Sequence, residues 1–253
     1  MKKFVFLWIA MAALMTSCIS IQEIKSEKPV KSEKRQVQPF ERVRLFGSPT
    51  IYYAQTNQVS LRVEAPEDLL EFVETEVSDS CLIVRMKDSP KTVISSIRFA
   101  DSDEVRVYVT SPDLIDVALY GSGDFKSDNH IDTDNLKVEL KGSGNIDFAD
   151  IICDQIKTTL IGSGDVSIGH VTAASSAIEL VGSGDVDINH ESTEHIDIML
   201  KGSGDIKAGF QGCGDVVSEL RGSGDITLSG DVRSLQNRSI GSGSFHTEQL
   251  KMP

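Results

Sequence analysis

The chain has 253 residues, with 25 Lys and Arg against 38 Asp and Glu, so its formal net charge is −13. An acidic protein repels the phosphate backbone of nucleic acids. Only 6% of the residues are Phe, Trp or Tyr, which leaves few rings for stacking on bases. The composition therefore excludes nucleic acid as an expected partner.

The chain begins with the pattern of a secretory signal. Lys2 and Lys3 precede an apolar run over residues 4–15, which is too short to anchor stably across a bilayer. Small residues lead directly into Cys18, as in the lipobox of bacterial lipoproteins. We therefore expect residues 1–17 to be a signal peptide and Cys18 to carry acyl chains that hold the protein to a membrane. Ordinary secretory cleavage, with a plain thiol left at that cysteine, is the alternative.

Residues 18–37 follow as a polar segment rich in Lys and Glu. The segment has no sustained apolar period, so it cannot bury enough apolar surface to offset the entropy of ordering. We predict a disordered tether here, with the acidic charge of the protein concentrated in the folded body behind it.

Residues 38–120 contain short segments in which apolar and polar residues alternate. These segments lie at 43–45, 59–63, 82–86 and 105–109. Alternation with a period of two predicts strands. We interpret this half as the first, irregular coils of a larger column, and a separate small β domain is the alternative.

Residues 121–245 repeat with a period of about 20, and each repeat begins with Gly-Ser-Gly. These glycines are expected where the backbone turns sharply or a neighbouring coil crowds the chain. The triplets begin at Gly121, Gly142, Gly162, Gly182, Gly202, Gly222 and Gly241. Between triplets the residues alternate, as in Val166 and Ile168, which predicts at least two short strands per repeat and no helix.

A unit of two short strands cannot bury its apolar face alone. Identical units stacked about 4.8 Å apart bury those faces in a common column and pair each strand with its neighbours above and below. We therefore predict an all-β fold, a right-handed parallel β-helix with three sides and about 20 residues per coil. This single domain is expected over residues 38–245, and residues 246–253 are expected to cap it.

Stacking would place residues one period apart in columns. One column is acidic, and we expect each carboxylate to accept N–H bonds across its own glycine turn, with a calcium ladder as the alternative. Its members are Asp124, Asn145, Asp165, Asp185, Asp205 and Asp225. A second column holds His130, Asp150, His170 and His190. We interpret it as an exposed polar corner, with a transition-metal site as the alternative. We predict no cofactor.

Cys153 and Cys213 have the same phase but lie three coils apart, or about 14 Å at the strand spacing. A disulfide needs Cα atoms within about 7 Å, so these two cannot bond to each other. With Cys18 acylated, Cys81 is the one remaining partner for either. We expect buried free thiols.

The alternation over 40–86, the strand at 105–109, the segment Ser111-Pro112-Asp113-Leu114 and the serial Gly-Ser-Gly-Asp motifs resemble a known family. This is the "Putative auto-transporter adhesin, head GIN domain" family, and the resemblance covers about residues 40–245. It implies a β-helix, a secreted or lipid-anchored location and an adhesin-like role.

Catalysis on a β-helix needs a cleft built by long loops, but the coil length here varies only from 19 to 21 residues. The sequence also lacks a Ser/His/Asp order, a glycine-rich phosphate loop and an HExxH motif. We therefore expect no enzyme, but a lipoprotein of the cell envelope, anchored in the outer membrane and facing the periplasm or the surface.

Two non-catalytic functions are compatible with such a column. The first is an adhesin or ligand-binding module that presents a repetitive face to a glycan or protein ligand. A stripe of exposed residues would favour it, and the candidates are Tyr120, Ile161, Val181 and Met199. The alternative is a structural scaffold of the periplasm or outer membrane that binds a protein partner through an end of the column.

Overall fold

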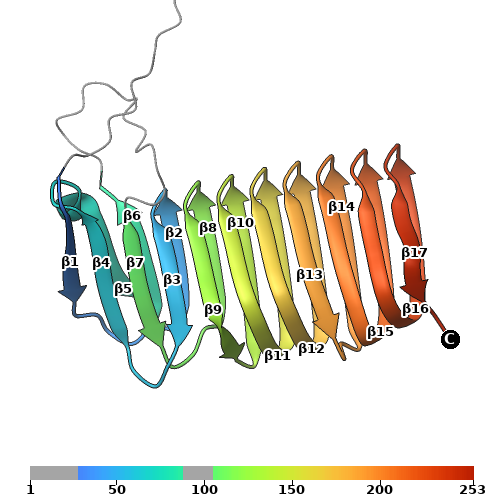
Figure 1. The fold of residues 1–253 in the computed structure, drawn as a ribbon, viewed down its shortest axis with the longest axis horizontal. Helices are drawn as coiled ribbons and strands as arrows, with labels where there is room; N and C mark the ends of the chain where they lie inside the picture. The colour runs from blue at the N-terminus through green and yellow to red at the C-terminus, as the bar shows by residue number, and fades with distance from the viewer. Residues whose placement is uncertain (1–27, 88–104) are drawn as a thin grey trace, which may run out of the picture.

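The computed structural model describes residues 28–87 and 105–253, and their strands join in one continuous sheet (Figure 1). The sheet winds into a β-solenoid of about 7 turns with coils of roughly 20 residues, which confirms the predicted fold. The predicted signal peptide, Cys18 and residues 19–27 of the predicted tether lie outside the described residues. Within the described ranges, no helix has the length and apolar character needed to cross a bilayer.

The strands follow one another with short connections over most of the chain. They are β1 (Val30–Arg35), β2 (Arg42–Gly47), β3 (Thr50–Gln55), β4 (Ser60–Pro66), β5 (Val73–Ser78), β6 (Cys81–Met86), β7 (Arg106–Ser111), β8 (Asp116–Gly121), β9 (Asp124–Asp132), β10 (Asn135–Gly142), β11 (Asn145–Gly162), β12 (Asp165–Gly182), β13 (Asp185–Glu191), β14 (His195–Gly202), β15 (Asp205–Gly222), β16 (Ile226–Gly241) and β17 (Phe245–Lys251). A 3-10 turn, η1 (Leu70–Phe72), precedes β5.

One regular coil, residues 145–164, shows why the column has three sides. Its inward-facing buried side chains are Ile146, Phe148, Ile151, Cys153, Ile156, Thr158 and Leu160. Inward positions alternate along each side, but two consecutive residues face outward at 149–150 and again at 154–155. Each such pair reverses the alternation and turns a corner. The Gly-Ser-Gly turn makes the third corner, so a coil has a first face after that turn, a short second face, and a third face before the next turn.

Parallel pairing in register places each inward residue over its equivalent one coil away. Leu160 of β11, for example, lies opposite Leu180 of β12. One such column on the third face consists of leucines that are at most 1% exposed: Leu45, Leu119, Leu140, Leu160, Leu180, Leu200 and Leu220. Burying each side chain contributes about 1.5–3 kcal/mol, so the repeat is stabilised mainly by its stacking.

The N-terminal half differs from the prediction of simple first coils. Strands β2 and β3 do form a coil. The later strands β6 and β7 pair with the edges of β2 and β3 that face away from the regular coils. The coil made by β6 and β7 is therefore the first in the stack, although it comes second along the chain. Beyond it the pairing becomes antiparallel, since β5 pairs with β6 and β4 with β7. These antiparallel strands cover the edge that the parallel column would otherwise leave open.

The predicted disordered tether is wrong for residues 30–35, which form strand β1. This strand pairs antiparallel with β4 along its whole length, from Val30 opposite Pro66 to Arg35 opposite Leu61. It is an edge strand with hardly any buried side chain, so it has no alternating apolar signal for the sequence to reveal.

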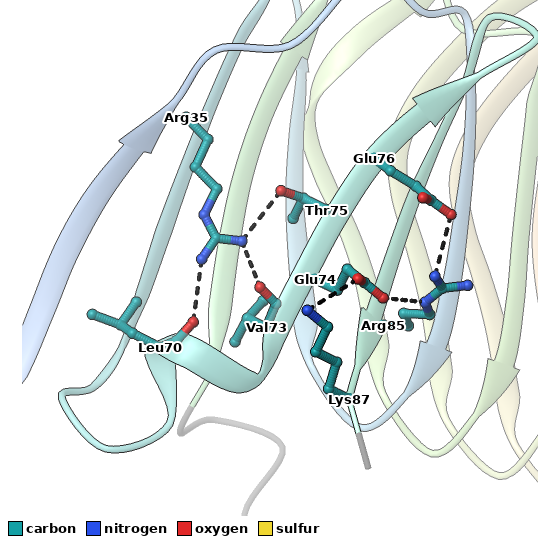
Figure 2. A network of polar contacts seen from close by, with 8 residues as sticks. All are labelled: Arg35, Leu70, Val73, Glu74, Thr75, Glu76, Arg85 and Lys87. Carbon is teal, nitrogen blue, oxygen red and sulfur yellow. Dashed lines mark hydrogen bonds and ion pairs between the residues drawn. The ribbon is translucent and has the colours of Figure 1, made fainter. Parts of the chain in front are cut away.

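Arg35 fastens this edge strand to η1 and β5, and we call β1, β4, η1 and β5 together the N-terminal cap (Figure 2). Its guanidinium donates to the carbonyl of Val73 at 2.6 Å, to the carbonyl of Leu70 at 3.2 Å and to Thr75 Oγ1 at 3.2 Å. Next to it, Glu74 accepts from Arg85 at 2.6 Å and pairs with Lys87 at 3.3 Å. The side chain of Arg35 is 17% exposed, so it holds η1, β5 and β1 together from a largely buried position.

At the other end, the predicted cap is a strand. β17 pairs in parallel with the first part of β16, with Ile226 opposite Phe245 and Asp231 opposite Lys251. Residues 245–251 therefore continue the column.

Candidate functional site

The glycines that begin the triplets occupy the sharpest turns of the column. All seven have φ between 135° and 147°, a backbone conformation that side chains other than glycine rarely adopt. A Cβ at Gly182 would also collide with the carbonyl oxygen of Gly162 in the coil before it. That carbonyl accepts two N–H groups of the following turn, from Ser183 at 2.9 Å and Gly184 at 3.2 Å. The glycines thus allow backbone to pack directly on backbone.

The acidic column is a ladder between coils, not a set of separate turns. The backbone N–H of Asp205 donates to Asp185 Oδ1 at 3.1 Å, and that of Asp225 donates to Asp205 Oδ1 at 2.9 Å. The predicted bond across each residue's own turn is therefore wrong, since the donor belongs to the next coil. Like charges about 4.8 Å apart in water repel by about 0.9 kcal/mol. These charge-assisted hydrogen bonds offset that repulsion.

The histidine column is only partly as predicted. Asp150 lies opposite both His130 and His170, and His130 Nδ1 is 2.6 Å from Asp150 Oδ2 at an exposed corner. A register shift then places His190 opposite Val171, and its side chain points into the core with 2% exposure. Across the described residues, no group of three or more His, Cys, Asp or Glu side chains is placed to hold a metal ion.

His190 forms a buried pair with Ser176, whose Oγ lies 2.9 Å from His190 Nε2. Its ring stacks on Phe210 at 5.7 Å, and burial lowers the pKa of His190 to about 4. A serine beside a histidine can act as an activated nucleophile. Both residues are only 2% exposed, however, so no substrate reaches them in this conformation.

The described cysteines Cys81, Cys153 and Cys213 are buried and free, which confirms the predicted burial. Burial raises the pKa of Cys153 to about 11 and also raises that of the other two. Each is therefore a protonated, unreactive thiol near neutral pH.

The proposed apolar stripe lies on the third face but is interrupted. Lys141 separates Tyr120 from Ile161 in one column, and Met199 belongs to the neighbouring column. Val217, in another column of this face, is also an exposed apolar side chain, at 46%. It borders a shallow hollow of about 290 Å³ together with Ala177 and Met199.

Glu139 organises the polar part of this face. It accepts from Lys141 at 2.7 Å, from Lys137 at 2.9 Å and from the hydroxyl of Tyr120 at 2.9 Å. Burial by itself would raise the pKa of Glu139, but these hydrogen bonds outweigh it and lower the pKa to about 2. The Tyr120 ring also stacks on Phe46 at 5.0 Å, so this cluster is fully paired.

A groove of about 460 Å³ crosses the first face at the N-terminal end of the column, and we call it the N-terminal groove. Strand pairing places five of its residues in one row across β1, β4, β7, β3 and β9: Lys34, Arg62, Tyr108, Tyr52 and Lys126. Tyr52 and Tyr108 stack at 5.1 Å, and the Arg62 guanidinium lies 4.0 Å above the centre of the Tyr108 ring. Asp128 also lines the groove.

Sequence reasoning missed this groove for two reasons. One of its cations, Lys34, lies in the segment predicted to be disordered, and the strand order that joins Tyr52 to Tyr108 is not the chain order. A signal was nevertheless present. The alternation of each strand places Tyr52 and Tyr108 outward, and Tyr is a residue type enriched at binding surfaces.

A column of parallel coils with a filled core and glycine turns defines a β-solenoid domain. The chain belongs to the family described as "Putative auto-transporter adhesin, head GIN domain", whose sequence model matches residues 39–212 and 171–253. The family is adhesin-like, which points to a protein of the cell envelope or surface.

Solved structures share the fold. A putative adhesin from Bacteroides fragilis is 23% identical with a TM-score of 0.76, over 88% of this chain and 99% of that one. A putative adhesin from Parabacteroides distasonis is 17% identical with a TM-score of 0.72, over 88% and 98% of the two chains. A putative lipid binding protein from the same species is 18% identical with a TM-score of 0.70, over 91% and 99%. No curated protein matches the chain.

Proposed function

We propose that this protein is a lipid-anchored, non-catalytic protein of the cell envelope that binds a ligand through the outside of its column. The adhesin-like family supports an envelope role. The filled interior supports binding on the outside, because the core columns leave no room for a ligand between the faces.

The observation that carries the proposal is the N-terminal groove. It gathers outward-facing aromatic and cationic side chains from five strands in one hollow. Aromatic residues and Arg are the side chains that most often dominate binding surfaces. A purely structural column has no need of such a cluster.

Absence of catalysis is proposed on the state of the described reactive groups. The Ser176 and His190 pair is closed off from solvent, and the buried thiols are protonated. A broad screen of hydrolase and lyase substrates should therefore give no turnover above that of a heat-unfolded sample, and reproducible turnover would contradict this part of the proposal.

The anchor is tested with the full-length protein expressed in a lipoprotein-processing bacterium. The mature protein should begin at Cys18 with the mass of its acyl chains, and it should sediment with membranes. Cys18→Ser should move the protein to the soluble fraction, whereas Cys81→Ser, at a buried cysteine, should leave it in the membranes. A soluble wild-type protein would refute anchoring.

The location of the column is tested by adding a protease to intact cells. Cleavage of the wild-type protein without cell lysis supports an adhesin that faces outward, and adhesion of these cells to a surface should then fall. Protection from protease would favour a periplasmic scaffold. The exposed apolar residues Ile161 and Val217 on the third face are the observation that favours this second function, since they suit contact with a protein partner.

A further inference from the structure

We propose that the N-terminal groove binds an acidic polysaccharide, with the anionic groups of successive sugars lying along the row from Lys34 to Lys126. This inference names the ligand class of the proposed function and rests on it. It is carried by the order, charge and pairing of the side chains in the row.

The row consists of hydrogen-bond donors. It presents an ammonium, a guanidinium, two phenol hydroxyls and a second ammonium, from residues paired across adjacent strands. Five strands at a spacing of about 4.8 Å extend it over about 19 Å. A ligand that matches it must therefore be long and must offer acceptors at regular intervals. A polymer of acidic sugars has this form, because one pyranose ring spans a distance comparable to one strand spacing.

Two of the three cations of the row, Lys34 and Lys126, are available to a ligand. Neither Lys34 nor Lys126 makes an ion pair with any residue in 28–87 or 105–253, whereas Arg62 pairs with Glu64. The groove lining contains these cations and the single carboxylate of Asp128, in a protein whose net charge is −13. Asp147 lies opposite Lys126 in the next strand, so the excess of cations is confined to the row from Lys34 to Lys126, where it attracts anions.

The tyrosines hold the row rigid. Tyr108 lies between Arg62, at 4.0 Å, and Tyr52, at 5.1 Å and nearly parallel, so its ring faces are covered. What these rings offer a ligand is their edges and hydroxyls, which have no hydrogen-bond partner among the described residues. The inward neighbour Tyr53 differs, since its hydroxyl lies 3.0 Å from Ser111 Oγ. A stacked, ordered row loses little entropy when it binds.

Other anionic partners fit less well. A membrane surface is normally contacted by apolar side chains that enter the lipid, but none of the exposed large apolar residues of the described chain lines the groove. Nucleic acid needs a wide basic surface, which the net charge of −13 does not provide.

The test uses the whole protein in detergent and measures binding to polygalacturonate, a carboxylated polymer, and to a sulfated dextran, with neutral dextran as the uncharged comparison. We expect one or both acidic polymers to bind, with affinity that falls as salt is raised, and neutral dextran not to bind. Equal binding of neutral dextran, or binding to vesicles of anionic lipid without binding to either polymer, would overturn the inference.

The decisive variant is Lys34→Gln with Lys126→Gln, because it removes two cations that make no intramolecular ion pair. It should lower the affinity at least tenfold, since a charged hydrogen bond contributes about 1.5–3 kcal/mol. Lys207→Gln is the matched control, because Lys207 lies in the same row of the first face, farther along the column, and should bind as wild type. Equal loss in both variants would also overturn the inference.

Tyr108→Phe tests the contribution of the hydroxyl to binding apart from that of ring stacking. It keeps the ring between Arg62 and Tyr52 and should weaken binding by about fivefold, the effect of one hydrogen bond. Unfolding midpoints of all variants should equal that of the wild type within error.

If neither acidic polymer binds while intact cells still adhere through the anchored protein, the ligand class is wrong and the proposed function stands. If the protein is neither anchored nor exposed, the proposed function itself fails.

Discussion

At the scale of single residues, the column depends on positions where a side chain is excluded. The carbonyl oxygen of Gly162 occupies the space in which a Cβ of Gly182 would lie. The element repeated in each coil is therefore a contact between backbones, and the hydrogen bonds from Ser183 and Gly184 require that contact.

Replacing Gly182 by Ala should destabilise the protein by about 3 kcal/mol, because the new methyl group both clashes with backbone and sits at φ 140°. Gly212→Ala is the matched control. Gly212 also has a positive φ, 62°, but a Cβ there would meet nothing within 4 Å, so the cost should be about 1 kcal/mol. Urea unfolding midpoints measure both, and equal losses would contradict the steric explanation.

The acidic ladder predicts a stabilising substitution. Asp185→Asn keeps the Oδ1 that accepts from Asp205 and removes the repulsion toward both neighbouring carboxylates. The chain already has an asparagine at one position of the ladder, where Asn145 Nδ2 donates to Asp124 Oδ1 at 3.0 Å.

We expect Asp185→Asn to raise the free energy of unfolding by about 1 kcal/mol at low salt, and the gain to shrink in high salt as the repulsion is screened. Asp185→Ala, which removes the acceptor, should destabilise by about 1 kcal/mol. A stabilising Ala variant would show that the ladder contributes only repulsion.

The lowered pKa of His190 predicts that the protein loses stability in mild acid. Its folded pKa of about 4 lies below the ordinary value of 6.5, so the unfolded chain takes up the proton first as the pH falls. Stability from this group is complete above pH 6.5 and is lost between about pH 6.5 and 4, by about 2 kcal/mol from pH 7 to pH 5.

The measurement compares the unfolding free energy at pH 7 and pH 5. His190→Phe, which keeps a ring beside Phe210, should lack this part of the loss, whereas His170→Asn at an exposed position should retain it. The same pH dependence in both variants would assign the effect to other groups.

At the scale of elements, the N-terminal cap is the part of the fold that the sequence did not predict. The regular coils could be predicted, because the spacing of the glycines and the alternation of residues such as Val166 and Ile168 each require stacking. β1 could not, because an edge strand with both sides in water has no buried face to produce a pattern. The inward position of His190 escaped prediction for a related reason, since the pairing of β12 with β13 shifts by one residue and places His190 opposite the buried Val171.

Arg35 makes the cap a separable unit, because its bonds to Leu70, Val73 and Thr75 join β1 to η1 and β5 (Figure 2). Arg35→Met should increase hydrogen exchange in β1 and η1 while the exchange of β11 and β12 stays unchanged. Lys31→Met, which removes an exposed ion pair with Glu67, is the control and should change exchange little. Faster exchange throughout the column would mean that the cap and the coils unfold together.

At the scale of the whole molecule, the column behaves as a stack of nearly interchangeable coils. Deleting residues 165–184 removes one full period and joins Gly164 to Asp185, which preserves the phase of every remaining column. We expect this variant to fold with an unchanged strand signal in circular dichroism, and to be shorter by about 4.8 Å in small-angle scattering.

Deleting residues 165–174, half a period, is the control for this prediction. It would place polar residues at buried positions in all later coils, so we expect it to aggregate or unfold. Folding of both deletions would show that phase does not govern the stack.

The turns also give the molecule a direction. From Gly47 to Gly222, each turn carbonyl that accepts from the next Gly-Ser-Gly segment points toward the C-terminal coils, so the peptide dipoles add head to tail as they do in an α-helix. The dipoles of this row of turns have their positive end toward the coils that hold Lys34, Arg62 and Lys126, whereas the dipoles within the strands alternate and largely cancel. The glycine turns therefore add a small backbone potential that favours anions at that end, in addition to the lysine side chains.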